Sequence, residues 1–455
     1  MPNVIVRRFM FMIALCCLLF LVLAMDKSVW GEEVNSDVQY SLADLIAIAE
    51  QQNPLLKAAQ EQVNQARARE LQSASQLAPK LDANLIYAHE YGGGIKESKY
   101  RDTYKAALSF THTLYSGDSF EASLRAATLN RKALEADLLR TKQSVENDVR
   151  KSYYDLQRAR AQLRVAQESY DLALEHLKQA KSLYEQGVIA VNEVLRTQVD
   201  VSTAELNLIQ AQNGTRVALN TLEKAVGVTL SFSQVPEIAP KEETRLSLPK
   251  IDPYATALQK RPELVSLDDS RKAAEELAKA AAGQARPSIS IQGETSYYED
   301  EFFPNSDDWN LSVIASWRLY DRGEIKNKIE ENKAMARELL ARIDDLRNQI
   351  RLEVSTAWQN MESALQRVHV AEDQVKTAEE DYRMALRRYV EQVGTNIDVL
   401  DARTALTDAN TSFVNAVYDA YAAYSDLIYS IGASEEDLMS ADQESNVEVG
   451  KEGAR

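Results

Sequence analysis

One pattern of residues occurs twice along the chain. A spacing of 25 residues separates Pro54 from Pro79 and also separates Pro262 from Pro287. Further along, matching dipeptides recur at an offset of 205 residues: Leu114-Tyr115 with Leu319-Tyr320, Val165-Ala166 with Val370-Ala371, and Val194-Leu195 with Val399-Leu400. Such self-similarity indicates one supersecondary unit in two copies. We expect repeat one at 32–227 and repeat two at 254–432, joined by a proline-rich linker at 228–253.

Each repeat is expected to contain a helix, a β-hairpin, a very long helix and a shorter helix, in that order. In the long helix, apolar residues recur every seventh position, and a second set rich in alanine lies four positions before them. In the first copy the two sets are Val149, Leu156, Leu163, Tyr170, Leu177, Tyr184 and Val145, Ser152, Ala159, Ala166, Ala173, Ala180. This spacing predicts a coiled-coil seam, although an ordinary helical bundle would show it too.

The long helix of the first copy sets the scale of the fold. From Ser119 to Glu185 it would extend about 100 Å at 1.5 Å per residue. The returning helix, Asn192 to Val226, covers roughly half of that length. We therefore expect the leading helix, Leu42 to Ala78, to cover the other half, with Pro262 to Ala285 as its counterpart in the second copy.

Composition and charge exclude several classes of protein. The chain has only 15 Gly and 10 Pro in 455 residues, so little of it is expected to be loop. Its net charge of −17 argues against a partner nucleic acid, because phosphate binding depends on clustered Lys and Arg. The four histidines lie on separate elements without ligand spacing, and no nucleophile elbow or phosphate loop occurs. We expect no enzyme activity, no cofactor and no metal site.

The N-terminus has the pattern of an export signal. Arg7 and Arg8 precede an apolar stretch at 9–25, and small residues at Ala24 or Gly31 offer a cleavage point. We expect residues 1–31 to be a signal peptide; an uncleaved membrane anchor is the alternative. No later segment is apolar enough for a transmembrane helix, so further membrane contact would have to use β-strands.

The segments expected to form hairpins, 80–115 and 288–320, alternate between apolar and polar residues. The clearest alternation places Trp309, Leu311, Val313, Ala315, Trp317 and Leu319 opposite Asn310, Ser312, Ser316 and Arg318. This pattern suits tilted membrane strands with an interfacial aromatic girdle of Tyr87, Tyr104, Tyr297, Trp309 and Trp317. A half-buried soluble sheet alternates in the same way, but the export signal and the long helices favour the membrane. Because four strands cannot close a barrel, we expect the chain to oligomerise.

The segment from Tyr389 to Ala402 reads YVEQVGTNIDVLDA, and its counterpart from Tyr184 to Leu195 reads YEQGVIAVNEVL. With these segments and its two repeats, the sequence resembles the TolC family of outer-membrane efflux ducts. This resemblance implies a mostly α fold with membrane β-strands, in which a homotrimer forms a twelve-stranded β-barrel continued by a periplasmic α-barrel. It also implies location in the outer membrane, extending into the periplasm, and two protein partners, a periplasmic adaptor and an inner-membrane transporter. The expected function is an exit duct for the substrates of that transporter.

The resemblance also implies roles for residues at the helix turns. The acidic residues that would line a constricted gate are Glu193, Asp398 and Asp401. The residues that would contact the adaptor at the tips are Gly187, Val188, Gly394 and Thr395. Both glycines fall at turns where a positive φ favours Gly, and Asp398 falls in the first turn of a helix, so turn geometry and helix capping are the alternatives. Some relatives carry a latching arginine after Val-Gly-Thr. That place holds Asn396 here, or Gly394 when counted back from Asp398 without a gap, and neither residue is basic.

A periplasmic coiled-coil scaffold or adaptor without pore activity is the competing hypothesis. It would need neither membrane strands nor an outer-membrane location. An adaptor would also carry a lipoyl-like β-domain, which this sequence lacks. Residues 433–455 are acidic and contain Gly450 and Gly453, so we expect a disordered tail.

Overall fold

The computed structural model describes residues 39–94, 97–237, 246, 248–249, 251–299 and 307–433. The expected signal peptide at 1–31 and nearly all of the expected acidic tail at 433–455 lie outside the described residues. All helices and strands of the described residues belong to one compact unit that begins at Tyr40.

The elements follow the same order in the two halves of the chain. The first half contains α2 (Leu42–Gln52), α3 (Pro54–Ser75), β1 (Lys80–Gly94), β2 (Glu97–Tyr115), α4 (Ser119–Glu185) and α5 (Val191–Val226). A short 3₁₀ turn, η1 (Phe232–Gln234), follows. The second half contains α6 (Pro253–Lys260), α7 (Pro262–Gly283), β3 (Ser288–Glu299), β4 (Asp307–Ser316), α8 (Glu324–Val390) and α9 (Asn396–Ile431). The lengths match as well, because α4 and α8 each span 67 residues and α5 and α9 each span 36. The expected mostly α fold of two tandem repeats is confirmed.

The leading helix is broken, contrary to the expectation of one helix from Leu42 to Ala78. Its first part, α2, ends at Gln52, and α3 begins at Pro54. Proline has no amide N–H and disfavours the helical conformation of the residue before it. Asn53 fills the break: its Oδ1 accepts from the Leu55 amide at 2.8 Å, and its Nδ2 donates to the Ala225 carbonyl at 2.7 Å. The break therefore connects the leading helices to the end of α5. Pro262 separates α6 from α7 in the same way.

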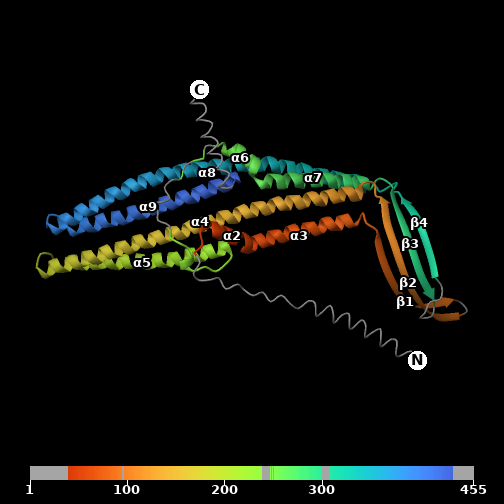
Figure 1. Cartoon of the computed structure of the whole chain (residues 1–455), viewed down its shortest axis with the longest axis horizontal. Helices are drawn as coiled ribbons and strands as arrows, with labels where there is room; N and C mark the ends of the chain where they lie inside the picture. Colours follow the sequence, from red (N-terminus) through yellow and green to blue (C-terminus); the bar gives the residue numbers. More distant parts are fainter. Residues whose placement is uncertain are drawn as a thin grey trace, which may run out of the picture. The chain divides into compact units, whose positions relative to one another are not determined.

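The two long helices organise the helical part of the unit. Helix α4 packs against α5 and α9 along one half of its length and against α3 and α7 along the other. Helix α8 packs against α9 and α7. The helices therefore lie in the order α5-α4-α9-α8 in one half and α3-α4-α7-α8 in the other. Within this unit, the sheet lies at one end of the bundle and the α4–α5 and α8–α9 turns lie at the opposite end (Figure 1).

The seam residues of the long helices form much of the core. Val149, Leu156, Ile350 and Met361 are completely buried, as the heptad spacing predicts. The alanine positions let the helix backbones approach closely, and Ala173, Ala180 and Ala364 are buried as well. None of the helices that the structure describes is both long enough and apolar enough to cross a bilayer.

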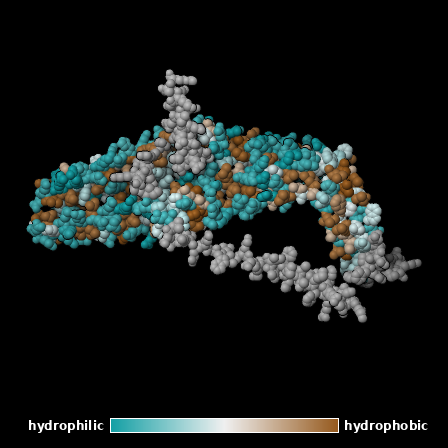
Figure 2. Space-filling model, viewed as in Figure 1, coloured by the Kyte–Doolittle hydropathy of each residue, from teal (hydrophilic) through white to brown (hydrophobic). Residues whose placement is uncertain are grey.

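The four strands form one antiparallel sheet in the order β1-β2-β3-β4. Pairing of β2 with β3 joins the two repeats. One face carries rows such as Leu81–Phe110–Gly293–Leu311, and the other carries rows such as Lys80–Thr111–Gln292–Ser312. On the visible face of the strands, hydrophobic side chains gather at the surface (Figure 2).

Strand β4 ends at Ser316, earlier than the expected hairpin end at Tyr320. Its last pair is Ser316 with Ser288, the first residue of β3. Pro287 precedes Ser288 and has no amide N–H to donate, so the ladder cannot continue in that direction. Trp317, Leu319 and Tyr320 therefore lie beyond the sheet and remain exposed.

Two glycines bring the β2–α4 turn and the end of α7 into backbone contact. A Cβ on Gly117, which has a φ of +70°, would lie 2.4 Å from the Gly283 carbonyl oxygen. A Cβ on Gly283 would lie 2.8 Å from the Gly117 oxygen and 2.8 Å from the Ser119 nitrogen. No side chain fits there unless the backbone moves.

We expect Gly283→Ala to lower the free energy of unfolding by about 1–3 kcal/mol, as overpacking does. Gly214→Ala in α5 is the matched control, because a Cβ there would meet nothing within 4 Å and the site is exposed. That change should stabilise the protein by about 0.5–1 kcal/mol. Thermal unfolding followed by circular dichroism measures both, and equal melting temperatures for the two variants would contradict the close contact.

Candidate functional site at the tips of the helical hairpins

The two tight turns at the far end of the bundle differ in geometry. Gly187, between α4 and α5, has a φ of +74°, and open space surrounds it. In the α8–α9 turn the positive φ of 59° falls on Gln392, at an offset of 205 residues from Gly187. The expectation that Gly394 would supply this conformation was wrong. Gly394 is required for a different reason, since a Cβ there would lie 2.9 Å from the Cβ of Arg388.

Asp398 and Thr395 form a capping box at the start of α9. The Thr395 amide donates to Asp398 Oδ2 at 2.9 Å, and the Asp398 amide donates to Thr395 Oγ1 at 3.2 Å. Hydrogen bonding of the carboxylate to the Thr395 backbone N–H, and to the Thr395 side chain, holds the pKa of Asp398 below its usual value. The carboxylate is exposed and stays ionised at neutral pH, so helix capping accounts for at least part of its role.

The other predicted gate residues lie on neighbouring helices. Asp401 is exposed on α9, three residues after Asp398, so the two acids share one face of that helix. Glu193 is half-buried in the first turn of α5, which contacts α9. Val188 is 42% exposed beside Gly187, so the tip presents an apolar residue to its surroundings. Thr395 is exposed and committed to the capping box.

A buried polar contact that the sequence analysis did not anticipate joins α4 to α9. His176 of α4 and Asn396 of α9 are 1% and 4% exposed, and His176 Nε2 lies 2.7 Å from Asn396 Oδ1. The Asn396 Nδ2 lies 3.4 Å from both the Glu193 carbonyl and Thr197 Oγ1 of α5. Asn396, which follows Val-Gly-Thr, thus connects the start of α9 to α4 and α5.

A second buried contact lies two turns further along α9. Arg403 Nη1 donates to the carbonyl and the hydroxyl of Ser169 on α4, at 3.0 and 2.9 Å. Its Nη2 pairs with Asp200 of α5. The side chains of Arg403 and Asp200 are 6% and 17% exposed, so this ion pair is largely removed from water. The two contacts attach α9 to both helices of the first hairpin.

Buried polar atoms without a partner concentrate at this tip. Among the described residues, five of eight such side-chain atoms belong to His176, Gln179, Asp200, Tyr389 and Arg403. Unsatisfied buried groups are rare in folded proteins, and those that persist call for an explanation. A sequence signal for them did exist. Ser169 and His176 are seven residues apart, and so are Asn396 and Arg403, which means that polar side chains repeat at core spacing on both helices.

Four residues of the predicted aromatic girdle lie on the apolar face of the sheet, and the fifth, Trp317, lies just beyond the end of β4. Trp309 is 80% exposed, and Trp317 is 61% exposed and donates through Nε1 to the Ala285 carbonyl at 3.0 Å. The rings of Tyr87 and Tyr104 are cross-strand neighbours with centroids 5.1 Å apart, and Tyr297 lies on the same face. From Trp309 to Trp317 an extended chain spans about 26 Å, close to the height of the apolar band of a membrane barrel.

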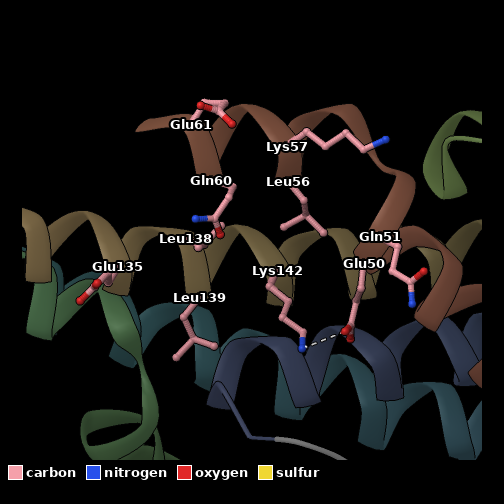
Figure 3. Close-up of a pocket in the computed structure, with 10 residues that line it drawn as sticks. All are labelled: Glu50, Gln51, Leu56, Lys57, Gln60, Glu61, Glu135, Leu138, Leu139 and Lys142. Atoms are coloured by element: carbon pink, nitrogen blue, oxygen red, sulfur yellow. Dashed lines mark ion pairs between the residues drawn. The ribbon is translucent and has the colours of Figure 1, made fainter. Parts of the chain in front are cut away.

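Two grooves occupy equivalent places in the two repeats. The first, of about 580 Å³, lies where α2 and α3 meet α4, and the Lys142–Glu50 ion pair of 3.0 Å borders it (Figure 3). The second, of about 560 Å³, lies where α6 and α7 meet α8. Leu56, Glu61 and Lys142 of the first groove correspond to Leu264, Asp269 and Arg347 of the second, so these equivalent positions keep their chemistry, whereas Val265 stands in place of Lys57. They follow from the helix breaks at Pro54 and Pro262. No group of His, Cys, Asp or Glu among the described residues is arranged to hold a metal ion.

The chain is similar to known outer-membrane proteins in both sequence and fold. The family model described as "Outer membrane efflux protein" matches residues 45–228 and 254–433. "Outer membrane efflux protein BepC" of Brucella suis is 24% identical over 373 residues, covering 77% of this chain and 76% of that protein. "Outer membrane protein TolC" of Vibrio cholerae is 23% identical over 426 residues, covering 91% and 94%. Among solved structures, the outer membrane channel CmeC of Campylobacter jejuni has a TM-score of 0.76 at 19% identity, covering 92% of this chain and 93% of that one.

Proposed function

The chain belongs to the outer membrane efflux protein family, and we propose from that premise that three copies form an exit duct across the outer membrane and periplasm. The duct would receive its substrates from an inner-membrane transporter through a periplasmic adaptor. The observation that best supports a ring of copies is that the sheet and both helical layers have unpaired edges on the same two sides of the chain.

The open edges are those of the sheet and of both helical layers. In the sheet, β1 and β4 are each paired on one side only. In the helical layers, α3 and α5 lie at one end of the order and α8 lies at the other. Two different edges that fit each other make a head-to-tail contact, and such contacts form a ring when the rotation between copies closes. Apolar residues remain exposed on α5 (Leu195, Val199, Leu206, Ile209) and on α8 (Leu352, Val370, Met384, Val390).

The strand number favours three copies. An open strand edge in lipid leaves amide groups without partners, which costs several kcal/mol per group. With four strands per chain, three copies give twelve strands, within the range of known membrane barrels. The same closure would join α5 or α3 of one copy to α8 of the next and continue the barrel as a helical tube. The tips at Gly187, Val188, Gly394 and Thr395 would then form the end that meets the adaptor.

We also propose that Glu193, Asp398 and Asp401 form an acidic gate at that end. Each copy contributes three carboxylates to one opening. At a separation of about 6 Å, two such charges repel by roughly 3 kcal/mol at an effective dielectric of 20. Cations should therefore bind in the opening, and multivalent cations should bind most strongly. Capping by Asp398 is compatible with this role, because the capped carboxylate keeps its charge.

The gate predicts a block of ionic current. In planar bilayers, the full-length protein should conduct in small, cation-preferring steps that a trivalent cation on the tip side blocks. Asp398→Asn combined with Asp401→Asn should raise the blocking concentration by roughly tenfold or more, because two of the three charges per copy are lost. Asparagine retains an oxygen for the Thr395 amide, so the cap is preserved.

Asp408→Asn is the matched control, since Asp408 is an exposed acid on α9 one heptad beyond Asp401. It should leave the block unchanged. Equal block of all three proteins would overturn the gate assignment and keep the duct. Absence of membrane insertion and of conductance would instead favour the periplasmic scaffold.

A further inference from the structure

His176 is the one histidine of the described residues that is buried between the two helical hairpins. Asn396 Nδ2 faces the Glu193 carbonyl and Thr197 Oγ1, which leaves Asn396 Oδ1 facing the ring. Since that oxygen can only accept, His176 Nε2 must carry the hydrogen of the 2.7 Å bond. In a neutral ring the other nitrogen, Nδ1, is then unprotonated.

In the joined tip, His176 Nδ1 has no acceptor within hydrogen-bonding distance for a second proton. The atom is buried without a hydrogen-bond partner. From α8, the Tyr389 ring lies edge-on with its centroid 5.2 Å from that of the imidazole. From α5, Glu193 and Asp200 are the nearby acids, and from α9 Arg403 is the nearby base. Asp200 Oδ1 is paired with Arg403 and its Oδ2 is buried without a partner, so neither oxygen is hydrogen-bonded to the ring.

We propose that His176 is a proton sensor, whose protonation releases the first turns of α9 from α4 and α5 and loosens the tip when the periplasm acidifies. The inference rests on the proposed duct for its physiological meaning. Protonation would place a charge and an unpaired N–H in a closed contact between two hairpins. Separation of the hairpins exposes the ring to water and removes both penalties. Arg403 would act as the pivot, because its contacts to Ser169 and Asp200 do not involve the histidine.

The direction of the pH effect follows from the burial of the ring. Burial lowers the pKa of His176 in the joined tip, and the charge of Arg403 acts in the same direction. The hydrogen bond to Asn396 and the charge of Asp200 oppose the shift without cancelling it. A separated tip restores an ordinary pKa of about 6.5 and binds more protons. The joined tip is therefore favoured above that pH and loses population below it, by up to tenfold per pH unit for one proton.

Distances between spin labels would test the sensor in the assembled full-length protein. The labels would be attached to cysteines replacing Glu185 and Glu391, which are exposed at the ends of α4 and α8, with labelled chains diluted among unlabelled ones. Between pH 7.5 and 5.5 the wild-type protein should gain a population with a longer separation, up to about tenfold larger than at neutral pH. His176→Gln keeps an N–H for Asn396 and cannot titrate, so its distances should stay short at both pH values.

Two further variants complete the test. His369→Gln removes an exposed histidine of α8 and should respond to pH as the wild type does. Asn396→Asp places a carboxylate against His176, stabilises the protonated ring, and should keep the tip joined at pH 5.5. A pH response that persists in His176→Gln, or a wild type that does not respond, would overturn the sensor. Bilayer conductance recorded in parallel separates this outcome from failure of the duct, which would abolish current at every pH.

Discussion

Val313→Arg should keep the protein out of the membrane, whereas Ser312→Arg, one residue away, should not. Val313 is 69% exposed on the apolar face of β4, midway between Trp309 and Trp317. Ser312 lies on the opposite, polar face, in a row with Gln292. In a closed barrel the first position would face lipid at the middle of the bilayer and the second would face the water-filled lumen. Arginine at the lipid-facing midplane costs about 2–4 kcal/mol per chain, and the proposed trimer would carry three copies of the change.

Fractionation of cell envelopes and the yield of the proposed trimer after cross-linking would measure this difference. We expect trimers of Val313→Arg to fall at least tenfold below those of Ser312→Arg, with the helical signal in circular dichroism equal for both proteins. Since the two changes introduce the same residue into the same strand, general effects of charge and strand propensity cancel. Equal insertion of both variants would mean that the apolar face does not meet lipid.

The faces of the sheet can be predicted because a strand has a period of two. The alternation from Trp309 to Trp317 fixes which residues share a face, whatever the strand pairs with. The heptads of the long helices are equally informative, because the spacing of Val149 and Leu156 marks the side of the helix that must be buried. The strand alternation and the helix heptads are each a pattern within a single strand or helix, so the sequence of that segment is enough to reveal them.

The contacts at the tip cannot be predicted in this way. His176 and Asn396 are 220 residues apart, and no periodicity within α4 or α9 specifies which helix faces the other. From the resemblance alone, Asn396 is notable only because it is not basic. In the structure it is buried and contacts His176. Sequence reasoning also assigns the positive φ of the α8–α9 turn to the wrong residue. It favours Gly394, whereas Gln392 has the positive φ.

Asp200→Leu should loosen the tip more than Arg403→Leu, although the two side chains form one ion pair. Removal of Asp200 leaves the guanidinium of Arg403 buried at 6% exposure, with only the neutral groups of Ser169 to contact. Breaking a buried pair from one side typically costs about 3–5 kcal/mol. Removal of Arg403 costs less, because the Asp200 carboxylate is 17% exposed and can reach water by a small movement. Removal of both should cost less than removal of Asp200 alone, since no buried charge remains.

Hydrogen exchange of the amides from Asn396 to Ala409 at pH 7.5 would measure this order, because a hairpin tip opens locally before the whole chain unfolds. Asp200→Leu should accelerate exchange there by about a hundredfold, which corresponds to roughly 3 kcal/mol. The double variant should exchange more slowly than Asp200→Leu, which gives a favourable coupling energy for the native pair. The exposed Arg383–Glu380 pair of α8 is the control, and its coupling should stay below about 1 kcal/mol. If the two single variants and the double variant exchanged alike, the buried pair would contribute nothing to joining the hairpins, and His176 with Asn396 would hold the tip alone.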